Sequence, residues 1–147
     1  MAGDFFEGTW TTCAEPDELL VAARFPVWDG PCGFAIEEVA RRHGDFAIAG
    51  AVADVRVDDQ NRVKQLAVAM FGVAATPVRA PDAEAALHNR AIDAITPADI
   101  AEIAALAAAA TDPADDIHAT AAQRRRIVQH VVGNVVRRAV EEANANA

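Results

Sequence analysis

The spacing between hydrophobic residues changes along the chain and divides it into stretches with a strand-like or a helix-like repeat. Residues 47–57 and 63–73 are two apolar runs, and the first alternates strictly towards its end, as a strand with one buried face does. Residues 58–62 between them are polar turn formers, so the two runs predict a β-hairpin. Residues 34–42, FAIEEVARR, contain good helix formers but would also suit a strand beside the hairpin, so the pattern leaves both open.

The second half of the chain has a helical pattern. Asp82 is a candidate cap for a short helix that continues through Leu87. Thr96 and Pro97 supply an N-cap and a first-turn proline for a second helix. A third, long helix follows a capping-box spacing that begins at Thr120. Apolar residues then recur every three or four positions and predict one buried face: Ile127, Val131, Val135 and Ala139 or Val140.

Residues 1–30 are β-like and rich in large apolar side chains. Threonine and aromatic residues around Trp10 favour a strand, and Leu19–Phe25 is a second strand-like run. The sequence Glu15–Asp17 between them is a turn signal. Most large aromatic side chains lie in the first half, whereas the helical half is rich in alanine, which buries little area per residue.

Length and charge narrow the class of protein. The 147 residues, 52% of them hydrophobic, fit one domain or one domain with an appended piece of another. The net charge of −9 argues against a nucleic-acid binder, and the arginines at 124–126 and 137–138 are expected on a solvated or ion-paired helix face. No apolar run approaches 18 residues and no signal peptide is evident, so we expect a cytoplasmic protein without a membrane span.

Candidate chemistry is sparse. Cys13 and Cys32 lack metal-ligand spacing and are expected to be reduced thiols. The four histidines are scattered, and the carboxylates at 37–38, 54 and 58–59 are expected to be solvated rather than paired for acid–base work. We therefore predict no catalytic residue and no metal ligand in this chain.

The polar cluster beside Gly44 admits two interpretations. Arg41 and Arg42 could bind a phosphate through two guanidinium groups, or they could form ion pairs that fix a loop against the sheet. The structural role is favoured. Gly44 would allow the chain to reverse, with Asp45 stabilising the turn through hydrogen bonds or an arginine pair.

Three motifs in chain order resemble one family. They are RRHGDFA from Arg41, GVAATPVRA from Gly72, and DIHATA from Asp116 followed by two arginines. All are similar to the C-terminal domain of the FAD-binding medium subunit of molybdenum hydroxylases, the carbon monoxide dehydrogenase and xanthine dehydrogenase family. One departure is Gln123, where the family usually has tyrosine, which we expect to alter only helix packing.

The resemblance covers nearly the whole chain and implies its organisation. Residues 1–30 are similar to the end of the family's FAD-binding domain, and residues 31–147 to its C-terminal domain. In the family the segment 34–42 is a strand. The resemblance thus implies an α+β fold, an antiparallel three-stranded meander packed against about three C-terminal helices.

The resemblance also implies a flavin site. Leu19 and Leu20 match family positions that pack near the isoalloxazine ring of FAD, and Glu37 falls where some members place a flavin-contacting lysine. The family's glycine-rich loops, whose backbone amides bind the FAD pyrophosphate, do not occur in this sequence. We therefore do not expect the chain to bind FAD tightly alone.

By this resemblance the chain is part of a medium subunit, either truncated or one half of a split subunit, and inactive alone. It would form one wall of the flavin site and contact a molybdopterin large subunit and an iron–sulfur small subunit, or a separate FAD-binding chain. The alternative is a non-catalytic interaction or assembly module that has lost FAD binding. Its apolar strands would then need a partner, for example a second copy in a homodimer.

Overall fold

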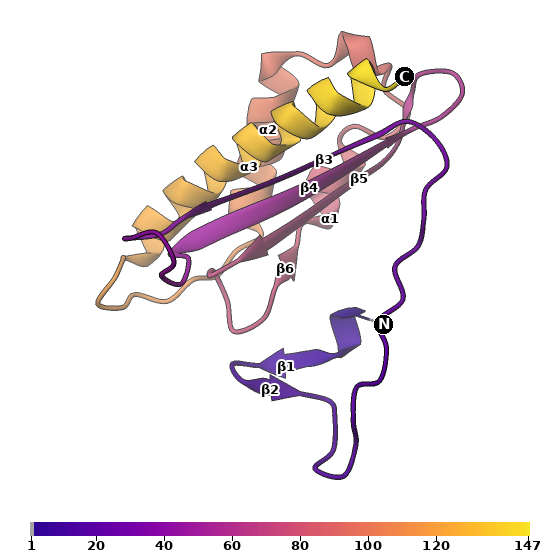
Figure 1. Cartoon of the computed structure of the whole chain (residues 1–147). Helices are drawn as coiled ribbons and strands as arrows, with labels where there is room; N and C mark the ends of the chain where they lie inside the picture. Colours follow the sequence, from indigo (N-terminus) through magenta and orange to yellow (C-terminus); the bar gives the residue numbers. More distant parts are fainter. Residues whose placement is uncertain (1) are drawn as a thin grey trace.

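Four antiparallel strands in chain order form the main sheet of the computed structural model, which describes residues 2–147 (Figure 1). They are β3 (Cys32–Val39), β4 (Ala49–Val57), β5 (Val63–Phe71) and β6 (Val78–Arg79). The helices are α1 (Pro81–Ala85), α2 (Pro97–Ala109) and α3 (Ala121–Ala145), with a short 3-10 turn, η2 (Ile92–Ala94), between the first two. The expected α+β meander with three helices is confirmed.

The sheet has one strand more than expected. After Pro77, the pair Val78–Arg79 lies antiparallel to Ala69 and Met70 and adds β6 at the edge. Two residues are too few to give an alternating pattern, so hydrophobic periodicity could not reveal this strand. The ambiguous segment is a strand, as the resemblance implies, and β3 pairs with β4 in an unbroken register.

Local signals account for the predicted hairpin and for two of the three helix starts. In the β4–β5 turn, the Asp58 carboxylate accepts the backbone N–H groups of Gln60 and Arg62, which lowers the pKa of Asp58. Thr96 and Thr120 both form complete capping boxes. The predicted Asp82 cap is wrong: α1 begins at Pro81, so Asp82 lies inside its first turn.

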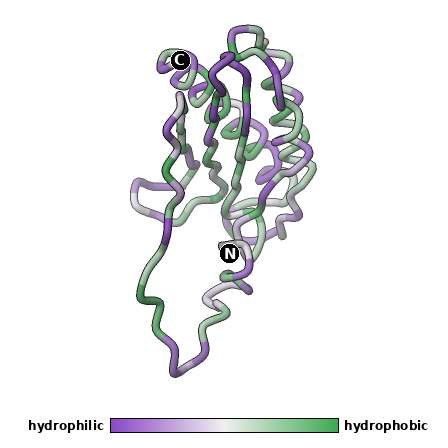
Figure 2. Tube along the Cα trace, turned by 90° about the vertical axis from the view of Figure 1, so that its right-hand side faces the viewer, coloured by the Kyte–Doolittle hydropathy of each residue, from purple (hydrophilic) through white to green (hydrophobic). Residues whose placement is uncertain are grey.

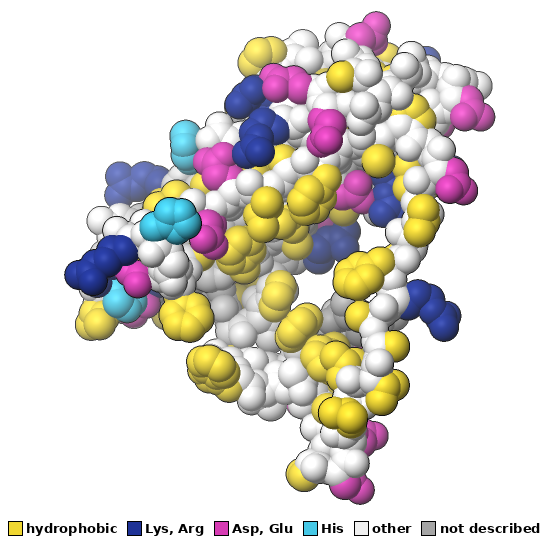
Figure 3. Space-filling model, viewed as in Figure 1, with side chains coloured by type: hydrophobic (Ala, Val, Ile, Leu, Met, Phe, Trp, Pro, Cys, Tyr) yellow, Lys and Arg dark blue, Asp and Glu magenta, His cyan; other side chains and the backbone are white. Residues whose placement is uncertain are grey.

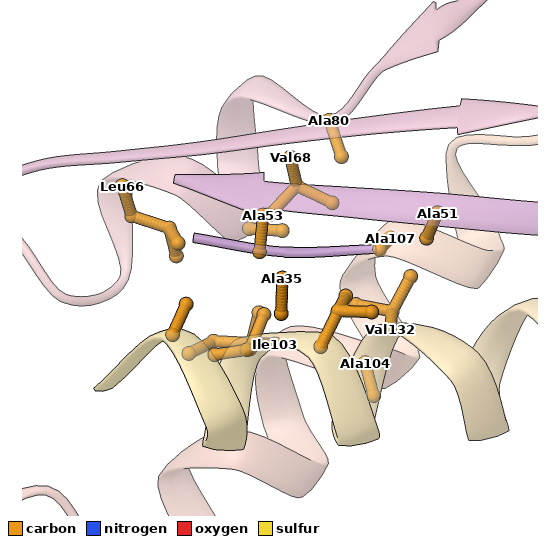
Figure 4. Close-up of a cluster of buried hydrophobic side chains, with 14 of the residues drawn as sticks. Ala35, Ala51, Ala53, Leu66, Val68, Ala80, Ile103, Ala104, Ala107 and Val132 are labelled. Atoms are coloured by element: carbon orange, nitrogen blue, oxygen red, sulfur yellow. The ribbon is translucent and has the colours of Figure 1, made fainter. Parts of the chain in front are cut away.

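The core lies between the sheet and α2 and α3, which cover the same face (Figure 4). Ala35, Ala51 and Ala53 carry small side chains on this face and let α3 approach the strands closely. The predicted face of α3 is confirmed: Val131, Val135, Ala139 and Val140 are buried, and Ile127 packs against the core from its margin.

The closest approach of helix and sheet is at Gly33. A Cβ atom there would overlap the Ala139 carbonyl oxygen and come within 2.6 Å of the Ala143 backbone nitrogen. Because both atoms belong to the α3 backbone, no side-chain rotation could relieve the overlap. Gly33 therefore sets how near α3 lies to β3.

The N-terminal region stands apart from this two-layer body. After the 3-10 turn η1 (Ala2–Asp4), the strands β1 (Phe6–Gly8) and β2 (Thr11–Thr12) form a small hairpin. Residues 13–31, which we call the arm, then run to β3 as an extended segment (Figures 1 and 2). The strand predicted over Leu19–Phe25 is wrong, because no neighbouring strand lies beside it to complete a ladder.

Candidate functional site

The sheet has one face without helices, which we call the open face. It consists of alternate residues of β3, β4 and β5, whose neighbours in sequence point into the core. Phe34 and Ile36 are 58% and 54% exposed on it. The other members are partly buried or exposed: Glu38, Val52, Asp54, Arg56, Ala67, Ala69 and Phe71. Figure 3 shows hydrophobic side chains gathered over the sheet below α3 and along the arm.

The open face mixes apolar and charged side chains: Phe34, Ile36 and Phe71 share it with Glu38 at the Gly50 end and with Asp54 and Arg56 at the other, which we call its charged end. A Cβ atom at Gly50 would overlap the Phe71 ring, so the glycine allows that ring to lie across the neighbouring strand. Towards the β4–β5 turn, Arg56 donates to the Asp54 carboxylate at 2.9 Å. The face can therefore contact an apolar group through Phe34 and Ile36, and it offers a salt-bridged pair towards the β4–β5 turn.

Trp28 fastens the arm to the charged end of this face. The Arg56 guanidinium carbon lies 5.5 Å and the Lys64 ammonium nitrogen 4.8 Å from the centre of its ring. The indole N–H also donates to the Pro31 carbonyl oxygen at 3.3 Å, and that oxygen accepts the Val57 N–H as well. These contacts determine where the arm leaves the sheet.

A buried arginine joins three loops at the far end of the sheet. Arg124, in the first turn of α3, is 8% exposed. Its guanidinium donates to the carbonyl oxygens of Ile48 and Gly72 and, at 2.6 Å, to the carboxylate of Asp116. The carbonyls precede β4 and follow β5, so one side chain links both strands to the loop before α3.

Asp116 is the acidic partner in this node. Its carboxylate accepts the backbone N–H groups of Ala119 and His118 in addition to the Arg124 guanidinium. The Ala119 hydrogen bond, the arginine and the His118 hydrogen bond together lower the pKa of Asp116 to about 2. Asp116 is therefore ionised at neutral pH and balances the buried charge of Arg124.

A pocket of about 760 Å³ opens beside the node. Its walls are the β3–β4 loop, the turn after β5 and the loop before α3, and Thr9 of the N-terminal hairpin lies at its margin. At its rim Arg41 Nη1 lies 3.2 Å from His118 Nδ1. The arginine and the histidine close one side of the pocket.

The structure separates the sequence-predicted flavin contacts. Leu19 and Leu20 lie in the arm, 83% and 64% exposed. Glu37 lies on the opposite face of the sheet from the open face and accepts a hydrogen bond from Asn134 Nδ2 at 2.9 Å. Its second oxygen is 3.7 Å from Arg138. The two leucines therefore face solvent, whereas Glu37 connects β3 to α3.

The polar cluster around Gly44 is a turn. Gly44 has a φ of +89°, and the Asp45 backbone N–H donates to the Arg42 carbonyl oxygen at 3.1 Å. Within residues 2–147, no hydrogen bond or ion pair engages the side chains of Arg42 and Asp45. Of the two expected alternatives, Asp45 therefore makes a hydrogen bond, through its backbone, and the arginine pair does not form.

The role of Arg124 was not predicted, because the arginines at 124–126 were expected to share one solvated or ion-paired helix face. Arg125 donates to Asp112 at the surface and Arg126 to its own helix, so the expectation is confirmed for these two. The available signal was the position of Arg124 three residues after the end of the DIHATA motif, within the family resemblance. Residues 2–147 contain no group of three or more metal-ligating side chains, and no helix among them is long and apolar enough to cross a membrane.

Comparison with known proteins places this architecture among redox subunits. The family profile for the CO dehydrogenase flavoprotein C-terminal domain matches residues 34–143. The chain is 37% identical over 146 residues to the carbon monoxide dehydrogenase medium chain of Afipia carboxidovorans, a match that covers 99% of this chain and 48% of that protein. It is 34% identical to caffeine dehydrogenase subunit beta of Pseudomonas sp., over 94% of this chain and 45% of that one.

A solved structure agrees. Carbon monoxide dehydrogenase from Hydrogenophaga pseudoflava, in a form that lacks the Mo-pyranopterin moiety of the molybdenum cofactor, has a chain that superposes with a TM-score of 0.86 at 30% identity. The match covers 96% of this chain and 48% of that one. The chain thus spans about half the length of the relatives that it matches.

Proposed function

The chain belongs to the CO dehydrogenase flavoprotein C-terminal domain family, and from this premise we propose that it forms one wall of the flavin site in the medium subunit of a molybdenum hydroxylase. The open face carries this proposal. It exposes Phe34 and Ile36 on a sheet whose other face is fully covered by helices. A flat apolar surface of this kind suits one side of a planar ring system.

The residues fit the ring of FAD better than its diphosphate. Leu19 and Leu20 on the arm add apolar side chains that a bound isoalloxazine could contact. Glu37 stays a prediction from the resemblance alone, because it lies on the other face of the sheet from this ring and is bonded to Asn134. The sequence has no glycine-rich loop that would present several backbone amides to the diphosphate. In the family the flavin carries the electrons. The side chains of this chain would position it and exclude water.

The same surface would contact other polypeptides. The large molybdopterin subunit, the small iron–sulfur subunit, or a separate chain with the glycine-rich loops are the partners that the family suggests. A second candidate function is an assembly module without flavin, which would need only the exposed apolar side chains of the open face and the arm. In both cases the open face and the arm lie in an interface, but only in the first does the interface contain FAD.

Reconstitution distinguishes these functions. The chain is mixed with FAD, alone or with the half of the Afipia carboxidovorans medium chain that precedes the matched region, and flavin absorbance is recorded after desalting. We expect no flavin on the chain alone and retained flavin on the complex. Stoichiometric flavin on the chain alone would contradict the need for the loops, and a flavin-free complex would favour the assembly module.

A matched pair of variants locates the interface. Ile36→Asp introduces a charge on the open face, and Ile117→Asp makes the same change at an exposed isoleucine in the loop before α3. We expect at least a tenfold loss of complex formation for the first and none for the second. Equal behaviour of the two variants would exclude the open face as the contact surface.

A further inference from the structure

The strand β3 lies at one edge of the main sheet and should be open to pairing with another strand. It is eight residues long and contains neither proline nor lysine. Its register with β4 has no bulge. Short length, proline, lysine and a bulge all help to block an edge strand, and β3 has none of these four; its charged side chains, Glu37 and Glu38, lie near its C-terminal end.

Side chains from α3 occupy the β3 edge instead. Asn146 Nδ2 donates to the Cys32 carbonyl oxygen at 2.9 Å. A carboxylate oxygen of Glu142 accepts the Phe34 N–H at 2.8 Å. Arg138 Nη1 donates to the Ile36 carbonyl oxygen at 3.4 Å and lies beside Glu37. Three alternate strand residues are therefore bonded to three side chains of one helix.

The geometry of the two elements makes this match possible. Residues four apart in a helix are separated by about 6 Å along its axis, and residues two apart in a strand by about 6.6 Å. The two spacings nearly match, so the side chains at 138, 142 and 146 lie opposite positions 36, 34 and 32 of the antiparallel strand. Gly33 allows the α3 backbone to lie near enough for these side chains to reach.

Near the opposite edge of the sheet, a helix side chain again bonds an unpaired strand group, at one position. The β5–β6 pairing includes Ala69 and Met70 but not Val68. There Glu84 of α1 accepts the Val68 N–H at 3.0 Å, and Arg79 holds the Glu84 carboxylate with two hydrogen bonds. A glutamate from a helix therefore covers an unpaired strand N–H on both sides of the sheet.

We propose that Arg138, Glu142 and Asn146 are an edge guard that prevents a second copy of this chain from adding its β3 strand to the sheet. An antiparallel edge is self-complementary, because a two-fold axis brings the donors of each copy to the acceptors of the other. The guard occupies the Cys32 and Ile36 carbonyl oxygens and the Phe34 N–H within the monomer, so strand addition would first have to break these three hydrogen bonds. This inference does not depend on the proposed function.

The test uses two triple variants of the full chain. R138A/E142A/N146A removes the guard. R137A/E141A/N144A removes the same three residue types from exposed positions of the same helix, where Arg137 and Glu141 bind only each other and Asn144 makes no hydrogen bond within residues 2–147. The two triple variants therefore have the same net charge and the same number of alanines. Circular dichroism verifies folding, and analytical ultracentrifugation measures self-association.

We expect the guard variant to associate at least tenfold more tightly than the parent chain, and the control variant to match the parent. A folded guard variant with the association constant of the parent would overturn the proposal. Glu142→Ala alone gives a second measurement if the triple variant folds poorly. Hydrogen exchange of its Phe34 amide should slow as protein concentration rises, and exchange independent of concentration would equally contradict the guard.

Discussion

At the scale of single residues, one glycine and one buried arginine determine how closely the elements approach. Gly33 allows the α3 backbone to reach β3, and Arg124 draws the ends of β4 and β5 to the loop before α3. Gly33 has no room for a side chain, and Arg124 is bonded to two backbone carbonyl oxygens at once. Both are therefore positions where small substitutions should have large effects.

Gly33→Ala should destabilise the protein by about 1–3 kcal/mol, because the new methyl group overlaps helix backbone that cannot rotate away. Gly133→Ala is the matched control. Gly133 lies inside α3, and a Cβ atom there would meet only the Ala104 methyl group, at 3.8 Å. The alanine variant should therefore be more stable than the parent by about 0.5–1 kcal/mol. Urea unfolding of the two variants should thus shift the midpoint in opposite directions.

Asp116 should make stability depend on pH in acid. Because its pKa in the folded chain is about 2, below the ordinary value of 3.8, its contribution is complete above pH 3.8 and is lost as pH falls towards 2. Asp116→Asn should be less stable than the parent at pH 7, and this difference should shrink across that window. Asp112→Asn, at an exposed ion pair with Arg125, should show little difference. Thermal unfolding from pH 7 to 2 measures both, and a constant difference for Asp116→Asn would contradict the assignment.

At the scale of elements, the structures that could be predicted are those specified by neighbouring residues. The β4–β5 hairpin and the starts of α2 and α3 depend on contacts within about five positions, so their signals are visible in the sequence. The arm failed as a predicted strand because a strand also needs a partner. Arg124 was missed because its two carbonyl acceptors are 76 and 52 positions away, which no local pattern encodes.

The corrected start of α1 gives a prediction about caps. Thr120→Ala removes the hydroxyl that accepts the Gln123 N–H and should cost about 1 kcal/mol. Asp82→Ala should change the free energy of unfolding by only a few tenths of a kcal/mol. The Asp82 side chain makes no capping hydrogen bond, and its negative charge only interacts with the dipole at the start of α1. Chemical unfolding compares the two, and a similar loss for both would show that Asp82 caps α1 in solution.

At the scale of the whole molecule, the helices cover one face of the sheet and leave the other open. A helix glutamate bonds one unpaired strand N–H near each edge of the sheet, at Phe34 and at Val68, and the exposed apolar side chains gather on the open face and the arm. A protein that blocks its edges and exposes one face favours association face to face over strand addition. The direction of the arm then decides how much surface a partner can reach.

Trp28→Ala should release the arm from the sheet, because its ring lies against both Arg56 and Lys64 and its N–H is bound to Pro31. The chain has only two cysteines, Cys13 at the start of the arm and Cys32 at its end. Spin labels on both should give a broader distance distribution in the variant than in the parent. Trp10→Ala removes an indole that is 94% exposed and should leave the distribution unchanged. An unchanged distribution in Trp28→Ala would mean that the two cations do not fix the arm, and that its direction is set by the Pro31–Val57 backbone hydrogen bond alone.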